Sequence, residues 1–563
     1  MSQLMSRRQL LRFGVGSAGL MIITPILAAC STPSTPIGQA STSTTPTTAA
    51  GSTPASGSFT TGAASSGGAG SSTGAPATTG GGGSGTLKYA RTTGPTNFDP
   101  AAVIVAGDVY TLNQIFEPLY ITDVKGALQP HLAAGHTVSA DGLTYTFTLR
   151  KGVTFSDGSP LTSKDVASSI LRARDDKDGP LSFLDSAISS VTATGELTVV
   201  VALKQPWVPL ISDISAFSNS IVPDKLQGKS AAAFFAAPIG TGPFVLKSWT
   251  KGGTVVLARN EKYWQTGLPY LDGVEFSIVS DDNQLLQQLQ GAQVDVIDSF
   301  PAANVGDIKG NSALTLLNGP QWSVDLLLFN EKVAQFADRH VRRAISHLVN
   351  RKQISQAATF GTAAPADSFF PPSLQYYDGT ITVLGHDVAA AKAEMAQSKS
   401  ASGFTTEILV PSSDQNWNQM AQILQEALKA ISITVKIRSI ETAAYKAAFL
   451  KFDYEIMINN AINDISDPDE MASFQIDDVN GGSTSFWTGY HNPAAIALVT
   501  KAQAELDDTK RRALYRQIQQ TVADDAPYVP LVYPPALKAS STKVTSFEVN
   551  PAGAVRLENV KVS

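Results

Sequence analysis

The chain is poor in residues that cross-link proteins or bind metals. It has one cysteine, Cys30, among 563 residues. A single thiol cannot form an internal disulfide, so the fold has to be stabilised by its hydrophobic core. The six histidines form no H-x-x-x-H or H-E-x-x-H pattern, which argues against a metal-hydrolase site.

Positive charge is also scarce. Charged residues make up only 16% of the chain, the net charge is -6, and the body contains no dense run of lysine or arginine. A nucleic-acid-binding surface needs clustered positive charge, so we expect no nucleic-acid partner. The 43% of hydrophobic residues is enough for a sizeable core, and the length predicts several domains.

The first thirty residues have the pattern of an export signal. A basic stretch with Arg7 and Arg8 precedes an apolar stretch that ends in Leu27-Ala28-Ala29-Cys30. The apolar stretch is shorter than the roughly 20 residues that a transmembrane helix needs. The paired arginines resemble the twin-arginine export motif, and the last four residues resemble a bacterial lipobox. We predict a lipoprotein signal peptide over 1–30, with lipid on Cys30; the alternative is an ordinary signal peptide.

Residues 31–85 are almost entirely Ser, Thr, Gly, Ala and Pro and carry no charge. This composition is typical of a flexible tether, with an r.m.s. span of about 40 Å for a coil of this length. We therefore expect a disordered segment that links the lipid anchor to the body of the protein. The sequence leaves open whether the tether is glycosylated.

The body of the chain mixes strand and helix patterns. Apolar and polar residues alternate from Leu143 to Arg150 between two Asp-Gly pairs, which predicts a half-buried strand. Val341, Ala344, Ile345 and Leu348 recur at helical spacing after a candidate N-cap, Asp338. A second helical stripe from Met420 to Leu428 leads into an alternating segment that ends near Ile437. Helices that lead directly into strands indicate an α/β fold.

Motifs for catalysis or cofactor binding are weak. Gly240-Thr241-Gly242-Pro243-Phe244 lacks the lysine of a phosphate-binding loop and is better explained as a structural turn. Asp467-Pro468-Asp469-Glu470 matches only half of a calcium-binding loop. We predict no cofactor, no metal site, no catalytic residue and no enzymatic activity.

A series of short motifs occurs in the order found in one protein family. The motifs include Phe98-Asp99-Pro100, Phe116-Glu117-Pro118-Leu119-Tyr120, Asp141-Gly142-Leu143-Thr144-Tyr145, Phe155-Ser156-Asp157-Gly158, Gly240-Thr241-Gly242-Pro243-Phe244, Tyr263-Trp264, Val341-Arg342-Arg343-Ala344-Ile345 and Asp467-Pro468. Together they resemble the solute-binding proteins of peptide/nickel-type ABC importers, known as bacterial solute-binding protein family 5. The resemblance covers residues 87 to about 540.

The resemblance implies a two-lobed, type II clamshell of the periplasmic-binding-protein class, with an extra subdomain in the first lobe. The expected domains are lobe I at 86–280, with the inserted subdomain at about 126–215, lobe II at 281–526, and a return to lobe I at 527–563. The chain is expected to cross between the lobes near 278–282 and near 525–530. A ligand held between the lobes stabilises the closed form, because only that form contacts it from both sides.

The resemblance also suggests ligand-binding residues. In family members that bind peptides, an aspartate four residues before the proline of the Asp-Pro motif grips the free α-amino group, and here that residue is Asp464. The alternative is that Asp464 only caps a loop or helix. No arginine stands where dipeptide-binding relatives hold the ligand carboxylate, so a terminal-carboxylate anchor is in doubt. Trp417, Trp487 and Tyr490 are candidates for stacking on a ligand, and buried core positions are an equal alternative.

We therefore predict a monomeric, lipid-anchored substrate-binding subunit on the extracytoplasmic face of a bacterial membrane, in the periplasm or at the cell surface. It would capture di- or oligopeptides and deliver them to a permease driven by separate ATPase subunits. An oligosaccharide or a nickel or metal chelate is the alternative ligand. A surface hydrolase or a peptide-sensing receptor is the alternative class of protein.

Overall fold

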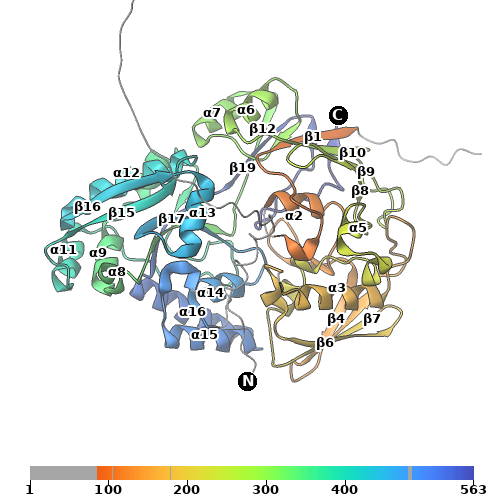
Figure 1. Cartoon of the computed structure of the whole chain (residues 1–563), viewed down its shortest axis with the longest axis horizontal. Coiled ribbons are helices and arrows are strands. Elements are labelled where there is room, and N and C mark those ends of the chain that lie inside the picture. The colour runs from red at the N-terminus through yellow and green to blue at the C-terminus, as the bar shows by residue number, and fades with distance from the viewer. Residues whose placement is uncertain (1–84, 104–105, 178, 480–484) are drawn as a thin grey trace, which may run out of the picture. The chain divides into compact units, whose positions relative to one another are not determined.

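The structure of the chain is a computed structural model that describes residues 85–103, 106–177, 179–479 and 485–563. In this part of the chain, the strands form a seven-stranded, a six-stranded and a four-stranded sheet, together with two small two-stranded sheets (Figure 1). Helices are interspersed with the strands along the described sequence.

The seven-stranded sheet has the order β12-β19-β11-β1-β10-β9-β8. Its strands are β1 (Thr86–Arg91), β8 (Phe244–Trp249), β9 (Val255–Arg259), β10 (Gly273–Ile278), β11 (Val296–Ile297), β12 (Leu314–Gly319) and β19 (Ala536–Ser541). β1 runs parallel to both of its neighbours, β10 and β11, whereas the outer pairs are antiparallel.

The six-stranded sheet has the order β14-β18-β13-β17-β15-β16. Its strands are β13 (Ser323–Phe329), β14 (Ala364–Pro365), β15 (Phe404–Pro411), β16 (Ile433–Ile440), β17 (Ile456–Ile462) and β18 (Tyr528–Tyr533). β15 runs parallel to β16 and β17. Each large sheet therefore contains three adjacent parallel strands, and its other neighbouring strands pair in the antiparallel direction.

The four-stranded sheet is antiparallel and has the order β4-β5-β7-β6. Its strands are β4 (Ala133–Val138), β5 (Thr144–Leu149), β6 (Ile188–Gly195) and β7 (Thr198–Leu203). Helix α3 (Ser163–Asp175) packs on β6 and β7 (Figure 1). This sheet lies within the range 126–215 in which the sequence predicts an inserted subdomain, and the limits of that subdomain stay a prediction.

The chain crosses between the two large sheets later than the sequence predicts. It leaves the seven-stranded sheet after β12 and returns between β18 and β19, instead of near 278–282 and 525–530. The segment after β10 stays with the seven-stranded sheet because α6 (Asp282–Gln290) is amphipathic. Its Leu285, Leu286 and Leu289 pack against β1 and β11 in one hydrophobic cluster.

The helices that matter for the site follow the strands of both sheets. Their bounds are α2 (Ala106–Leu112), α4 (Leu210–Asp213), α9 (Arg339–Leu348), α12 (Gln415–Leu428), α13 (Thr442–Lys451), α14 (Asp469–Ile476), α15 (Pro493–Ala504) and α16 (Asp508–Asp525). The last three, drawn in blue in Figure 1, pack against one another in sequence order.

Several local predictions are confirmed. The alternating segment is β5, and Gly142 in the Asp-Gly pair before it has a positive φ of 70°, which favours glycine. Asp338 caps α9 by accepting a hydrogen bond from the backbone of His340. The stripe from Met420 lies on α12 and the alternating segment after it forms β16.

The glycine-rich segment around Gly242 is a structural element, as predicted. A Cβ atom on Gly242 would lie 2.6 Å from the carbonyl oxygen of Gln114, so no larger residue fits without movement of the backbone. The Gly242 amide donates a hydrogen bond to the carbonyl of Ile115. The glycine therefore allows close backbone approach.

Both large sheets are buried on both faces. Along β1, Tyr89 belongs to one hydrophobic cluster and Ala90 to another on the opposite face. Leu326 and Leu327 of β13 divide in the same way between two further clusters. Helices therefore cover both faces of these sheets, which is typical of α/β proteins.

Candidate ligand-binding site

The candidate site is built around residues that follow the parallel strands of the two large sheets. In open α/β sheets, ligands bind beyond the carboxyl ends of such strands. Arg91 ends β1 and Asp298 follows β11 in the seven-stranded sheet. In the six-stranded sheet, Asp464 follows β17 and Trp417 follows the neighbouring strand β15. The fold thus places two of the predicted binding residues beyond adjacent strands of one sheet.

The loop that carries Asp464 is held by hydrogen bonds at both of its ends. Asn463 donates from its side chain to the carbonyl of Asp467 over 3.0 Å and accepts from the amide of Met471 over 2.9 Å. The Glu470 carboxylate accepts from the Asp464 amide over 2.6 Å. The backbone of the loop is thereby satisfied without use of the Asp464 side chain.

The Asp464 carboxylate has no counter-charge in the described part of the chain. It makes no hydrogen bond or ion pair with a described residue, and the residue is half-buried. Burial raises the pKa of Asp464 to about 6. An ionised carboxylate in such surroundings is unfavourable unless a cation approaches it. Asp464 is therefore suited to bind a positively charged group.

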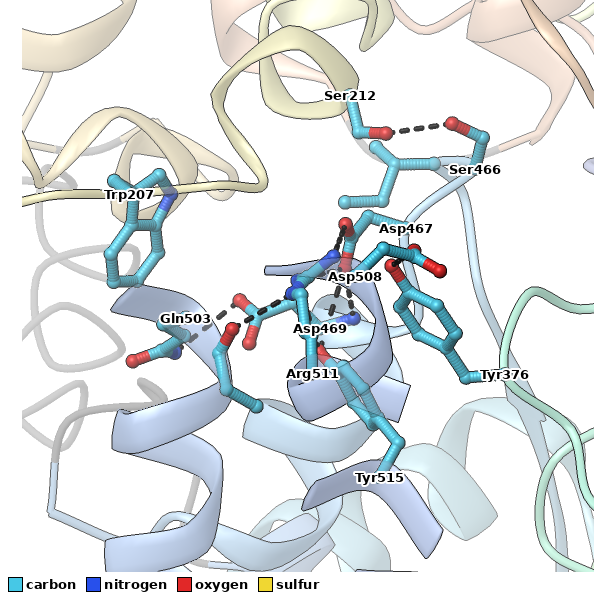
Figure 2. Close-up of polar contacts among 12 residues, drawn as sticks. Trp207, Ser212, Tyr376, Ser466, Asp467, Asp469, Gln503, Asp508, Arg511 and Tyr515 are labelled. Atoms are coloured by element: carbon cyan, nitrogen blue, oxygen red, sulfur yellow. Dashed lines mark hydrogen bonds and ion pairs between the residues drawn. The ribbon is translucent and has the colours of Figure 1, made fainter. Parts of the chain in front are cut away.

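A buried ion pair fixes the next part of the same loop (Figure 2). The Arg511 guanidinium of α16 donates to both oxygens of Asp467 over 2.6 and 2.9 Å, and its Nε donates to the carbonyl of Ala502. The Asp467 carboxylate, in the segment that matches half of a calcium-binding loop, is engaged by this arginine. Bidentate pairing of this kind gives both energy and fixed geometry.

The loop also contacts the segment around α4, which follows β7 of the four-stranded sheet in the sequence. The hydroxyl groups of Ser212 and Ser466 lie 2.6 Å apart (Figure 2). The amide of Val208 donates to the carbonyl of Gln503 over 2.8 Å. Two distant parts of the chain are therefore joined beside the candidate site.

Two buried carboxylates, those of Asp213 and Asp469, interact electrostatically at this junction. Burial raises the pKa of Asp213 well above its ordinary value, and the nearby charge of Asp469 raises it further. Burial and the charge of Asp467 raise the pKa of Asp469 to about 7, against the lowering effect of Arg511. Trp207 donates its indole hydrogen to Asp213 over 2.7 Å. The junction is thus most favourable when these carboxyl groups are protonated.

Tyr110 of α2 lies beside two charged groups of the seven-stranded sheet. The Arg91 guanidinium is 4.5 Å and the Lys538 ammonium 5.0 Å from the centre of its ring. Burial raises the pKa of Tyr110, Arg91 lowers it, and Asp298 and Asp464 raise it further. Asp464 is therefore within electrostatic reach of a residue that packs against the seven-stranded sheet.

Trp417 lies in the first turn of α12 and is half-buried. Burial raises the pKa of the nearby Asp325 of β13 to about 7, and Asn460 and Trp417 act to lower it. Asn460 of β17 donates to the same carboxylate over 2.8 Å. This polar group adjoins the strand that leads to Asp464.

Trp487 packs against other aromatic rings, and Tyr490 is buried in the hydrophobic cluster that Trp417 also packs against. The Trp487 ring is half-buried, with ring centres 5.1 Å from Phe449 and 5.9 Å from Phe474. Tyr490 is only 3% exposed and donates its hydroxyl hydrogen to Asp525 over 2.7 Å. The placement of Tyr490 matches the core position that the sequence left open as the alternative to ligand contact.

Tyr110, Asp325 and Lys538 are not among the residues predicted from the sequence. Asp325 lies on β13 of the sheet that bears Asp464, whereas Lys538 lies on β19 of the seven-stranded sheet, beside the ring of Tyr110. Lys538 had one available signal, because it is a lysine inside a strand of small and apolar residues, Ala536–Ser541. Its significance depends on strand pairing, which the sequence does not reveal.

Other site types find no support among the described residues. No group of three or more His, Cys, Asp or Glu there is arranged to hold a metal ion. None of the described helices is long and apolar enough to cross a membrane. Surface hollows of about 480 and 400 Å³ are lined by parts of α15 and α16 and by the segment around Asn350, and the four predicted residues line neither. Cys30 and the tether lie outside the described residues.

Comparison with known proteins agrees with this architecture. Residues 127–483 match the family model for the middle part of "Bacterial extracellular solute-binding proteins, family 5". The probable D,D-dipeptide-binding periplasmic protein DdpA of Escherichia coli (strain K12) is 29% identical over 475 residues, which cover 83% of this chain and 92% of that protein.

Two solved structures illustrate the fold and the range of ligands. The binding protein AgaA of A. tumefaciens R10, in complex with agropinic acid, has a TM-score of 0.75 and 27% identity, covering 85% of this chain and 99% of its own. DppA of Helicobacter pylori, in complex with the peptide STSA, has a TM-score of 0.73 and 25% identity, with the same coverage. The α/β, two-lobed periplasmic-binding-protein fold predicted from the sequence is confirmed. The chain belongs to family 5 of the bacterial extracellular solute-binding proteins.

Proposed function

We propose that this protein is the substrate-binding subunit of an ABC importer and that it captures peptides by their free N-terminus. The observation that carries the proposal is the Asp464 carboxylate, which is half-buried, faces no counter-charge among the described residues and sits on a loop held in place by Asn463, Glu470 and Arg511. The peptide relatives support the same ligand class.

The physical reason is complementarity of charge. Desolvation of Asp464 disfavours its ionised form, as its raised pKa indicates. An α-ammonium group brought to this carboxylate offsets that cost and forms a charge-assisted hydrogen bond. A ligand without a cation leaves the carboxylate unpaired, so the site discriminates against it.

Side chains near Asp464 offer apolar surface for the rest of a peptide. Ile462, two residues earlier, is 56% exposed, which is unusual for a large apolar residue at a strand end. Trp417 follows the neighbouring strand, and its half-buried ring is available for stacking. We assign Ile462 and Trp417 to side-chain recognition and keep Trp487 as a candidate for longer ligands.

The proposal includes no chemical change to the ligand. The bound, closed protein would dock on a membrane permease that is driven by separate ATPase subunits. Cys30, as the lipid-bearing N-terminus, would hold a monomer at the extracytoplasmic face of the membrane, and residues 31–85 would tether it. A binder of this kind returns its ligand intact.

Isothermal titration with the tripeptide Ala-Phe-Ala and its N-acetyl form tests the proposal. The unmodified protein is expected to bind the free-amine peptide about 10- to 100-fold more tightly, as a charge-assisted hydrogen bond predicts. Asp464→Asn should abolish this preference. The matched control is Asp453→Asn, since the Asp453 side chain is 73% exposed and Asp453 precedes β17, whereas Asp464 follows it.

Equal binding of both peptides by the unmodified protein would remove the assigned role of Asp464. Native mass spectrometry of the protein, purified without denaturation from a peptide-rich medium, gives an independent measurement. Added masses that fragment into peptides support the function. A co-purified sugar or metal chelate would contradict it.

A further inference from the structure

We infer that Lys538 binds an anionic group of the ligand, so that the protein selects a zwitterion whose ammonium lies on Asp464 and whose carboxylate lies on Lys538. This inference rests on the proposed function and deepens it. It assigns the second charged contact, for which the sequence shows no arginine at the positions used by dipeptide-binding relatives.

The first observation is that Lys538 is buried without an acceptor. It lies on β19 and is 4% exposed. Its ammonium makes no hydrogen bond or ion pair with any described residue. The nitrogen lies 5.0 Å from the centre of the Tyr110 ring. Buried ammonium groups are nearly always paired, because desolvation without a partner is costly. Burial lowers the pKa of Lys538 to about 8, which reflects that cost.

The ammonium nitrogen is not fully enclosed. Lys538 Nζ donates no hydrogen bond to a described residue and retains some solvent-accessible surface. The atom therefore keeps contact with solvent while the rest of the side chain is covered. The same holds for the carboxylate oxygens of Asp464. Each group therefore keeps its charged end in contact with solvent and without a partner among the described residues.

The local charge around Lys538 is incomplete. Asp298 is the one carboxylate that raises the pKa of Lys538, and its Oδ2 lies 3.6 Å from Arg91 Nε. The other oxygen of Asp298 accepts the amide hydrogen of Thr92 over 3.0 Å. Arg91 and Lys538 therefore both lie near Asp298, and both oxygens of this carboxylate are already engaged by Arg91 and Thr92. An additional anion beside Lys538 balances this charge.

Tyr110 relates the two binding groups in space. Its ring is 5.0 Å from Lys538 Nζ, and the Asp464 charge contributes to the raised pKa of its hydroxyl. Lys538 belongs to the seven-stranded sheet, whereas Asp464 follows a strand of the six-stranded sheet. A zwitterion that pairs with both groups contacts both sheets, and so favours the conformation in which they are close.

The chemical class that follows is a small molecule with a free ammonium and a carboxylate. A peptide carries these at its two termini, and an acidic side chain is a second source of the carboxylate. A neutral oligosaccharide offers neither charge. C-terminal amidation separates the two sources, because it removes the terminal carboxylate and leaves side chains unchanged.

The test compares Ala-Phe-Ala, its C-terminal amide, and the amide of Ala-Phe-Glu by isothermal titration. The unmodified full chain is expected to bind the free acid about 10- to 100-fold more tightly than the alanyl amide. Lys538→Met should remove this difference while keeping the preference for a free amine. Lys543→Met, at an exposed position just beyond β19, is the matched control and should behave as the unmodified protein. If the amide of Ala-Phe-Glu binds as tightly as free Ala-Phe-Ala, an acidic side chain is an equivalent source of the carboxylate.

Lys538→Met should also fold, because methionine fills a similar volume without a buried charge. The melting temperature of the unliganded variant is expected to rise. A variant that keeps the preference for the free acid over the amide would overturn the inference. If neither the unmodified protein nor its variants prefer the free-amine peptide over its N-acetyl form, the proposed function is overturned instead. The two failures are therefore distinguishable. Failure of the unmodified protein to bind any of these peptides would overturn both.

Discussion

Arg511 binds Asp467 with two hydrogen bonds, of 2.6 and 2.9 Å, and both side chains are buried. Asp467 lies three residues after Asp464, so this pair fixes the loop that presents the proposed amine-binding carboxylate. The loop is ordered by the protein itself, and a ligand does not have to bear the entropic cost of ordering it. Such preorganisation increases affinity without additional contacts.

Replacement of Arg511 by methionine is expected to destabilise the protein by about 3–5 kcal/mol, because it leaves the buried Asp467 carboxylate without its partner. Urea unfolding, followed by circular dichroism, measures this change. The neighbouring Arg512 is the control: its side chain is 58% exposed and pairs with Asp508 only at 3.7 Å. Arg512→Met should cost less than about 1 kcal/mol. Equal effects of the two substitutions would contradict a structural role for the buried pair.

The buried carboxyl groups of Asp213 and Asp469, whose pKa values are both raised, predict a stability that falls as pH rises. Burial and the charge of Asp467 raise the pKa of Asp469 to about 7. Ionisation of Asp469 therefore does not destabilise the folded state below pH 3.8, its ordinary pKa, and has its full destabilising effect above about pH 7. One pKa unit corresponds to about 1.4 kcal/mol, which sets an upper limit of about 4 kcal/mol for this group. Asp469→Asn removes the penalty.

The measurement is the melting temperature between pH 5 and 8. The unmodified protein should lose stability across this range, and Asp469→Asn should show a flatter profile with its largest gain at pH 8. Asp453→Asn, at an exposed position, should leave the profile unchanged. A parallel profile for Asp469→Asn and the unmodified protein would show that Asp469 does not titrate in this range.

The lipobox-like sequence before Cys30 predicts that this residue carries the membrane anchor. Cys30→Ala should therefore prevent incorporation of labelled fatty acid and shift the protein from the membrane to the soluble fraction. The mass of the mature chain identifies the cleavage site directly. An unchanged membrane fraction without label would indicate that the signal segment is retained as the anchor instead.

The sequence by itself determined the elements whose cause is local. The alternation over Leu143–Arg150 corresponds to β5, and the helical stripe after Asp338 corresponds to α9 with that residue as its cap. These features depend on side-chain periodicity, turn chemistry and capping, all of which act over a few residues. The family, and a role for Asp464, were implied by the resemblance of collinear motifs to a known family rather than by local patterns.

The tertiary structure decided how distant segments combine. Only strand pairing shows that β11 and β12 remain in the first sheet, which moves the crossing from 278–282 to the segment after Gly319. Only packing shows that Tyr490 is buried in the core, whereas Trp417 is half-buried. Lys538 and Asp464 are 74 positions apart, and no local pattern relates them. Their relationship to Tyr110 arises from long-range contacts between sheets, whose energies are set by burial and charge in the folded chain rather than by neighbours in sequence.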